Sequence, residues 1–473
     1  MNNQRASGIL MAVSSLPGPY GIGSLGKPAF DFVDFLAQSG QTYWQILPLV
    51  PPGDGASPYM SPSAFAGNPY FIDLDLLAQE GLLTPLELQS ARCDDPDRVD
   101  YNFLASTRIP LLQKAYERAR STSNELELPW LEDYAAFAAL HDQHQTDFRN
   151  WPNHAVPDTQ KVDFHFFLQR TFYRQWFALK DYANQKGIRI MGDIPIYLSG
   201  DSVELWKRPE LFQLDEKGRL KAVAGVPPDA FSQDGQLWGN PLYDWQVHKQ
   251  AVFNFWCQRI RWCQQIYDAV RIDHFRAFHT YWSVPANAAS AMEGHWEQGP
   301  GMELLDVLRK AAPGLELIAE DLGDLDADAL HFVRTCGVPG MKVMVFAFDP
   351  NGESAYLPHN CQGDCVAYTG THDTPTFVQW LQEGDPASTA YARTYLRLRD
   401  DEGLGWGVIA GAWATAARLA IAPMQDVLGL GADARMNAPG TMGKHNWSWR
   451  VRSEALNPHV ADRLRKLTYI YRR

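Results

Sequence analysis

The 473-residue chain lacks the features that mark several classes of protein. No segment reaches the roughly 18 consecutive apolar residues of a membrane span. The N-terminal stretch, residues 1–18, lacks the apolar length of a signal peptide. Lys and Arg form no basic run, and the formal net charge is −13. Nucleic acid and anionic membranes bind clustered basic residues, so neither is expected as a partner. These absences favour the cytoplasm and are compatible with a neutral ligand.

Cysteine is also scarce. The chain has six, at Cys93, Cys257, Cys263, Cys336, Cys361 and Cys365. They are too few and too scattered for a disulfide framework in a chain of this length. Cys361 and Cys365 are four residues apart, but no second cysteine pair or nearby histidine pair completes a zinc site. We therefore expect no structural metal.

Short apolar runs, several of them ending in a polar or charged residue, recur along the chain. The runs are Ile9–Val13, Thr42–Leu47, Ile188–Met191, Ala269–Ile272, Leu317–Ala319, Met341–Phe348, Val366–Thr369 and, more weakly, Ile421–Gln425. Nearly continuous apolar runs are typical of parallel strands that are buried on both faces. Eight of them, alternating with helical patterns, predict an α/β protein with a closed (β/α)₈ TIM barrel.

Three of the helical patterns are distinct, at Pro28–Gln38, Phe164–Gln185 and Val252–Tyr267. The spacing of the runs is uneven, so we expect one catalytic domain over residues 1–473 that carries two insertion subdomains of helices and loops. The first spans residues 50–160 after strand 2, and the second spans residues 200–250 after strand 3. The short stretch after the last run leaves no room for a C-terminal β-sandwich domain.

Acidic residues follow four of the runs: Asp193, Asp273, Glu320 and Asp373. The carboxyl ends of barrel strands meet on one face, so these side chains should share one bowl. Carboxylates gathered in a partly buried bowl repel one another and resist ionisation, which suggests a functional reason. One reason is a metal site, and another is glycoside chemistry, which uses a carboxylate nucleophile and a carboxylic acid. The alternative is that each acid caps the helix after it.

Arg271 lies two residues before Asp273, so both side chains should face the same way in a strand. Its positive charge would keep Asp273 ionised, as a nucleophile requires. His274 and His372, beside two of the acids, could donate hydrogen bonds to sugar hydroxyls. This combination favours glycoside chemistry over helix capping.

Several segments resemble a known family. VRIDHF (270–275), IAEDLG (318–323) and GTHDTPT (370–376) resemble conserved segments of the α-amylase-like superfamily. Four longer segments are more specific: GILMAVSSLPGPYGIGSLG (8–26), ILPLVPPGDGASPYMSPSAFAGNPYFIDL (46–74), GDIPIYLSGDSVELW (192–206) and GVPPDAFSQDGQLWGNPLYDW (225–245). They are similar to glycoside hydrolase family 77, the 4-α-glucanotransferase or amylomaltase family. The resemblance runs from about residue 8 to residue 450.

The resemblance implies a retaining transfer of α-1,4-glucan segments from a donor to the 4-hydroxyl of glucose or another α-1,4-glucan, such as a maltooligosaccharide. It implies that Asp273 is the nucleophile, Glu320 the general acid/base and Asp373 the acid that stabilises the transition state. The substrate contacts that it implies are Asp193, Arg271, His274, His372, Ser57, Tyr59, Asp349 and Asn437. No cofactor is expected. Asp193 is followed by IPIYLS where amylases carry an Asn-His pair, so no calcium site is carried over.

Other features have two interpretations. The segments GVPPDAF (225–231) and NAPGTMGKHNW (437–447) have the composition of rigid turns, but in this family they would arch over the cleft and restrict water. Trp238 and Trp245 could stack on glucose or pack in the interior. The segment SGDSVELW (199–206) indicates a helix start capped by Asp201 or Ser202.

Three rival functions remain open at this point. An α-glucan hydrolase would use the same acids. A metal-dependent barrel hydrolase would typically carry His-x-His on an early strand, where this chain has ILMAVSSL. A catalytically inactive glucan-binding protein would not need the intact set of acids.

Overall fold

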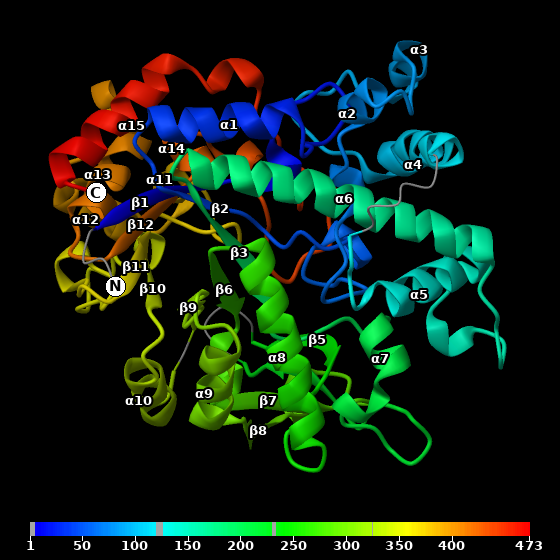
Figure 1. Ribbon diagram of the computed structural model, residues 1–473. Coiled ribbons are helices and arrows are strands. Elements are labelled where there is room, and N and C mark those ends of the chain that lie inside the picture. Colours follow the sequence, from blue (N-terminus) through cyan, green and yellow to red (C-terminus); the bar gives the residue numbers. More distant parts are fainter. Residues whose placement is uncertain (1–4, 120–125, 229–232, 324) are drawn as a thin grey trace.

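A computed structural model describes residues 5–119, 126–228, 233–323 and 325–473 of the chain. Its centre is an eight-stranded parallel sheet that curves into a barrel (Figure 1). Around the barrel the strands are β10 (Gly340–Val343), β11 (Cys365–Tyr368), β12 (Leu419–Pro423), β1 (Ala6–Leu10), β2 (Tyr43–Gln45), β3 (Arg189–Pro195), β6 (Ala269–Asp273) and β9 (Glu316–Ala319). Each of the eight predicted runs overlaps a strand of the barrel, and the predicted (β/α)₈ barrel is confirmed. The run 341–348 is shorter as a strand than predicted, because a 3₁₀ turn, Met344–Phe346, follows Val343.

The barrel closes between β9 and β10, the two ends of the strand order. Within the described residues these strands form no ladder. Ala319 N donates to Pro339 O at 2.8 Å, and Met341 N donates to the Asp321 carboxylate at 2.7 Å. This seam is therefore joined by one main-chain bond and one side-chain bond.

Helices pack around the outside of the barrel. They include α1 (Lys27–Gln38), α6 (Thr159–Gln185), α8 (Lys249–Ile266), α9 (Gly301–Ala311), α10 (Ala327–Thr335), α11 (Phe377–Glu383), α12 (Pro386–Tyr395), α13 (Leu404–Ala414), the short α14 (Met424–Val427) and α15 (Pro458–Tyr471). Three of them, α1, α6 and α8, match the helical patterns in the sequence. In α6, Asp158 accepts from the backbone N–H groups of residues 160 and 161, and Gly187, with φ of 77°, follows the helix end. Those are the usual start and stop signals of a helix.

Residues 50–160 form no regular strand where they are described. They hold the helices α2 (Leu74–Gln79), α3 (Pro85–Leu88), α4 (Tyr101–Arg118) and α5 (Leu131–His144), together with short 3₁₀ turns. In Figure 1 these helices lie beside the half of α6 farther from the barrel. Asp73, Thr84 and Asp100 cap α2, α3 and α4 through their side chains.

A second sheet lies beyond the barrel, and the sequence did not predict it. Its four antiparallel strands lie in the order β5 (Gln236–Pro241), β4 (Ala222–Val226), β7 (Thr280–Pro285) and β8 (His295–Gln298). The first two strands follow α7 (Val203–Lys207) in the segment after β3, whereas β7 and β8 come after β6. The sheet therefore joins two segments that flank the strand carrying Asp273. Antiparallel strands with one solvated face lack the continuous apolar runs that mark the barrel strands.

Residues 424–473 are all described, and they hold α14, α15 and 3₁₀ turns but no strand of a further sheet. None of the helices in the described ranges is long and apolar enough to cross a membrane.

The side chain of Arg473 joins the start of β1 to the end of α13 and the segment that follows it. Its guanidinium donates to the carbonyl oxygens of Ala6, Ala412, Trp413, Thr415 and Ala417, at 2.8–3.3 Å. One residue therefore satisfies main-chain acceptors on two parts of the barrel wall that are far apart in sequence.

Replacing Arg473 with Ala should lower the free energy of unfolding by about 1–3 kcal/mol, the usual loss when buried acceptors lose a charged donor. Denaturant unfolding followed by circular dichroism measures this. Arg472→Ala is the matched control, because Arg472 is exposed and packs only over the Tyr469 ring among its recorded contacts. Equal stability of the two variants would contradict the role of Arg473.

Candidate active site

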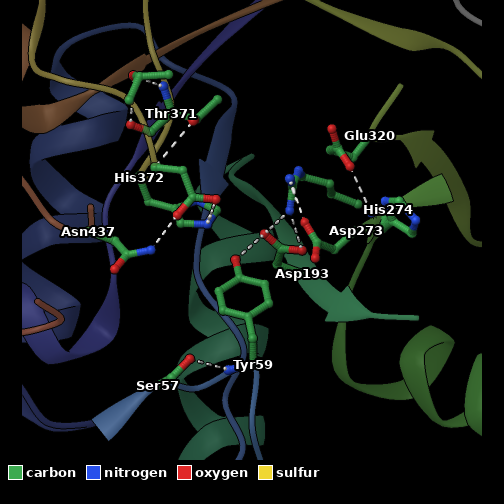
Figure 2. Close-up of polar contacts among 12 residues, drawn as sticks. Ser57, Tyr59, Asp193, Asp273, His274, Glu320, Thr371, His372 and Asn437 are labelled. Atoms are coloured by element: carbon green, nitrogen blue, oxygen red, sulfur yellow. Dashed lines mark hydrogen bonds and ion pairs between the residues drawn. The ribbon is translucent and has the colours of Figure 1, made fainter. Parts of the chain in front are cut away.

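The carboxyl ends of β3 and β6 place an arginine between two aspartates. The two strands are neighbours, with Asp193 opposite Arg271 and Pro195 opposite Asp273. Arg271 Nη1 donates to both oxygens of Asp193, at 2.9 and 2.8 Å, and Nη2 donates to Asp273 Oδ1 at 2.8 Å. Figure 2 shows Asp193 and Asp273 side by side near the centre of the site. The contact between Arg271 and Asp273 that their spacing predicts is present.

Burial dominates the electrostatics of this bridge. Asp193 is fully buried, and burial raises the pKa of its carboxyl, while Arg271 opposes the rise. Burial also disfavours the guanidinium, but Asp193 and Asp273 hold the pKa of Arg271 well above its usual value. The arginine therefore stays charged and compensates the aspartates, which would otherwise repel each other. Tyr59 adds a hydrogen bond from its hydroxyl to Asp193 at 2.9 Å.

Glu320 follows β9 and lies against the turn after Asp273. Its Oε2 accepts from His274 N at 2.8 Å, and its Oε1 accepts from Leu322 N at 3.0 Å. His274 has φ of 52°, a left-handed conformation that is uncommon for a residue other than glycine. Burial, followed by the charge of Asp273, raises the pKa of Glu320 to about 7. Glu320 can therefore hold a proton near neutral pH and also release it.

Asp373 lies beyond β11 in a different environment. Asn437 Nδ2 donates to its Oδ1 at 2.7 Å, and His372 Nε2 lies 3.3 Å from its Oδ2. Burial opposes ionisation, yet the His372 charge and these hydrogen bonds lower the pKa of Asp373 to about 2. The site thus holds one acid, Glu320, that can carry a proton near neutral pH, and another, Asp373, that is ionised at any pH well above 2.

Aromatic rings flank the acids on two sides. Tyr59 stacks on His372, with ring centroids 5.2 Å apart, and lies 5.6 Å from Trp447. The His274 ring lies 4.9 Å from Trp238 and 6.2 Å from Tyr197. Burial lowers the pKa of His274 to about 4, so its ring is neutral at physiological pH. Its Nε2 is buried and has no hydrogen-bond partner within the described structure.

The structure brings most of the sequence-predicted residues into this one group. Ser57 lies at its edge, where its Oγ accepts from Tyr59 N at 3.2 Å and so supports the Tyr59 backbone (Figure 2). Asp349 is different: it is exposed, and its carboxylate accepts from Asn351 N in its own turn. No contact recorded for the described residues joins Asp349 to the four acids.

The structure also distinguishes between the two interpretations of the tryptophans and of the cap of α7. Trp245 is buried against Tyr243 and Phe253, which favours packing, whereas Trp238 is partly exposed beside His274. Ser202 is the N-cap of α7 and accepts from Leu205 N. Asp201, the other candidate for that cap, pairs with His141 and accepts from Phe148 N.

Sequence reasoning missed Arg435. Its Nη2 donates to Asp373 O at 3.0 Å, and its Nε donates to Asn437 O at 2.7 Å. Asn437 N in turn donates to His372 O at 3.0 Å. Residues 435–437 thus bind the main chain of residues 372–373 through hydrogen bonds. No local pattern reveals this contact, because its acceptors are carbonyl oxygens that any residue offers.

The arrangement suits glycoside chemistry better than metal binding. Within the described residues no group of three His, Cys, Asp or Glu side chains is placed to hold a metal ion, and the cation between Asp193 and Asp273 is a guanidinium. An aspartate paired with an arginine, next to a glutamate whose pKa is raised to about 7, lies at the strand ends of the barrel. This matches the pair of carboxyl groups that cleaves glycosidic bonds. The fold and site define a carbohydrate-active barrel enzyme.

Comparison with known proteins specifies the family. The family model described as 4-alpha-glucanotransferase, of glycoside hydrolase family 77, matches residues 11–456, and the chain belongs to this family. The 4-alpha-glucanotransferase of Clostridium butyricum is 43% identical, over 98% of this chain and 100% of that protein. That of Thermus thermophilus is 42% identical, over 99% of each chain. The resemblance recognised in the motifs is confirmed, and the chain is an enzyme that transfers α-1,4-glucan segments.

Solved structures agree. The amylomaltase from Streptococcus agalactiae, solved in complex with acarbose, superposes with a TM-score of 0.93 and is 40% identical, over 99% of this chain and 100% of that chain. The amylomaltase from Corynebacterium glutamicum has a TM-score of 0.81 at 19% identity, covering 98% of this chain and 75% of that one, and supports the fold alone.

The pKa of Glu320 makes a prediction about pH. The raised value means that Glu320 is protonated below about pH 7 and loses its proton as the pH rises through that value. If it donates a proton to the leaving group, kcat/KM for donor cleavage should fall about tenfold per pH unit well above pH 7. Initial rates across pH 5–9 measure this limb. A rate that stays constant up to pH 9 would rule out Glu320 as the acid with this pKa.

Proposed function

We propose that this chain transfers α-1,4-glucan segments through a covalent intermediate on Asp273, with Glu320 as general acid and base. The observation that carries the proposal is the difference between the two groups. Arg271 donates a hydrogen bond to the Asp273 carboxylate beside the cleft, while burial raises the pKa of Glu320 to about 7. Neither group needs a metal or an organic cofactor to act.

In the first half-reaction, an Asp273 oxygen attacks the anomeric carbon of the donor. The bond from this carbon to the glycosidic oxygen breaks, and Glu320 gives its proton to that oxygen, which leaves as a hydroxyl. In the second half-reaction, the Glu320 carboxylate takes the proton from the 4-hydroxyl of glucose or of another α-1,4-glucan. That oxygen displaces Asp273, so the configuration at the anomeric carbon is retained and both groups return to their initial states.

The remaining predicted residues surround this reaction. We assign Asp373, ionised at any pH above about 2, to electrostatic stabilisation of the oxocarbenium-like transition state. The proposed substrate contacts are Asp193, Arg271, His274, His372, Ser57, Tyr59 and Asn437. His274 is partly exposed, but its Nε2 is buried without a partner in the described structure, so a movement of the ring would be needed to bring that atom to a sugar hydroxyl. Asp349 also belongs to the predicted contacts, but the structure adds no interaction that supports it.

Transfer requires that an acceptor compete with water at about 55 M, which demands a bound acceptor with high effective molarity and a sheltered site. We assign that shelter to Tyr59 and to the loops 437–447 and 225–235; residues 229–232 of the second loop lie outside the described ranges. Asn437 anchors the first loop to Asp373. Its Met442 reaches the segment just before Ser57, where a Cβ on Gly55 would lie 3.5 Å from Met442 Cε.

The whole chain is proposed to act as one catalytic domain, with residues 50–160 and 200–250 as insertion subdomains around the cleft. We propose the cytoplasm as its compartment, where the six free cysteines would stay reduced.

The nucleophile assignment predicts the effect of Asp273→Asn. An amide cannot form the ester intermediate, so transfer should fall by several orders of magnitude while the protein stays folded. Initial rates on maltotriose and a thermal melt measure both properties. Asp400→Asn is the control, because the Asp400 side chain is 87% exposed and forms only a surface ion pair in the structure. Near-normal transfer by a folded, homogeneous Asp273→Asn protein would end the assignment.

The transfer reaction predicts the products from maltotriose as the sole substrate. A transferase should make glucose and a ladder of longer maltooligosaccharides with little net rise in reducing ends, because each bond broken is replaced by a new one. Chromatography of the products together with a reducing-end assay checks this. Only shorter sugars, with reducing ends that rise steadily, would instead indicate hydrolysis.

A further inference from the structure

Asp321 follows Glu320 directly, and no step of the reaction uses it. The residue is only 9% exposed. Its Oδ1 accepts a hydrogen bond from Met341 N at 2.7 Å, at the start of β10. The neighbouring Gly340 makes room for this carboxylate, because a Cβ at that position would lie 2.2 Å from Asp321 Oδ2. A buried acid thus fits closely against the main chain of the next strand.

The bond between Met341 N and Asp321 matters because of where Asp321 lies in the barrel. On the β6 side, Glu320 is held by its own main chain: Glu320 N donates to Ile272 O, and Phe275 N donates to Glu320 O, both at 3.0 Å. The other side is the seam of the barrel, where β9 and β10 form no ladder within the described residues. Two recorded hydrogen bonds cross this seam. One joins Ala319 N to Pro339 O, and the other joins Met341 N to the Asp321 carboxylate.

The bond also ends on a residue that reaches the catalytic centre. Met341 is 1% exposed, and its Sδ accepts from Arg271 Nε at 3.4 Å. Arg271 in turn binds Asp193 and Asp273. Arg271 is held chiefly by its three hydrogen bonds to these aspartates, so a shift of Met341 should affect the nucleophile less than it affects Glu320.

We propose that Asp321 is a positioning residue that holds Glu320 at the depth and angle needed to protonate the glycosidic oxygen. It does so by replacing the missing strand pairing at the barrel seam with a carboxylate acceptor. The inference rests on the proposed role of Glu320 as acid and base. Misplacing a reacting group by about 1 Å can lower a rate by about 10²-fold, and the part of the reaction that suffers should be proton transfer.

Two donors that form the same intermediate allow proton transfer to be tested separately from the rest of the reaction. Maltotriose and α-maltosyl fluoride both give a maltosyl-enzyme, with release of glucose and fluoride respectively. Glucose leaves through an oxygen that needs a proton, whereas fluoride leaves with little help from an acid. Single-turnover release of glucose and of fluoride, with enzyme in excess, therefore separates loss of acid catalysis from general damage to the site.

Asp321→Ala should slow glucose release by about 10- to 100-fold and fluoride release by less than about threefold. Asp321→Asn keeps an oxygen acceptor and should stay within about threefold of the wild type for both donors. Gly340→Ala, which crowds the carboxylate, should show the selective loss seen with Asp321→Ala. Thermal melts and circular dichroism establish that each variant is folded.

Asp426→Ala is the matched control. Asp426 is 1% exposed and accepts from Phe377 N at 2.7 Å, but it lies beyond β12, away from Glu320. Its loss should slow both donors to a similar extent. A folded Asp321→Ala protein that slows both donors equally, or slows neither, would overturn the inference. If Asp321→Ala does not fold, Gly340→Ala decides by the same criteria.

Glu320→Gln separates failure of this inference from failure of the proposed function. It should lose glucose release and retain most of the fluoride release. If Glu320→Gln slows both donors equally, the acid assignment itself is wrong. If Glu320→Gln is selective and the Asp321 and Gly340 variants are not, the acid assignment stands and the positioning role is wrong.

Discussion

The site depends on one buried arginine. Asp193 and Asp273 end adjacent strands, and without a cation between them at least one would take up a proton. Arg271 lies on the same strand as Asp273 and opposite Asp193, so its planar guanidinium binds both carboxylates from a fixed position. Removing one partner from a buried charge group leaves the other uncompensated, which is more damaging than never having had the pair. The register of β3 and β6 therefore places the guanidinium against both carboxylates.

The other two acids are set apart by their surroundings. Glu320 is buried beside a negative charge and is held by two backbone N–H groups, so burial determines its behaviour. The Asp373 side chain is 39% exposed, and His372 and Asn437 bind it directly. Carboxylic acids on one face of a barrel thus differ in pKa because direct partners hold the charge of Asp373, whereas burial and the charge of Asp273 outweigh Arg271 at Glu320. This division of roles is what a two-step transfer needs.

The sequence predicted the barrel because parallel strands buried on both faces leave continuous apolar runs. It predicted the contact between Arg271 and Asp273 because residues two apart in a strand share a face. The antiparallel sheet was missed because β4 and β7 are more than fifty residues apart and β7 has no continuous buried run. The left-handed His274 and the contacts of Arg435 and Asp321 were also missed. Arg435 and Asp321 each bind a main-chain atom of a distant segment, which carries no signature in the side-chain sequence.

The antiparallel sheet has a consequence for how the chain is made. Its strands β4 and β5 are synthesised before β6, and their partners β7 and β8 come after it. During synthesis, the edge of β4 that later pairs with β7 therefore stays unpaired while the strand that carries Asp273 emerges from the ribosome. The sheet is complete only once residue 298 has left the exit tunnel. Until then the nascent enzyme has an open strand edge on β4, a stage at which chaperones that bind extended segments would have a target.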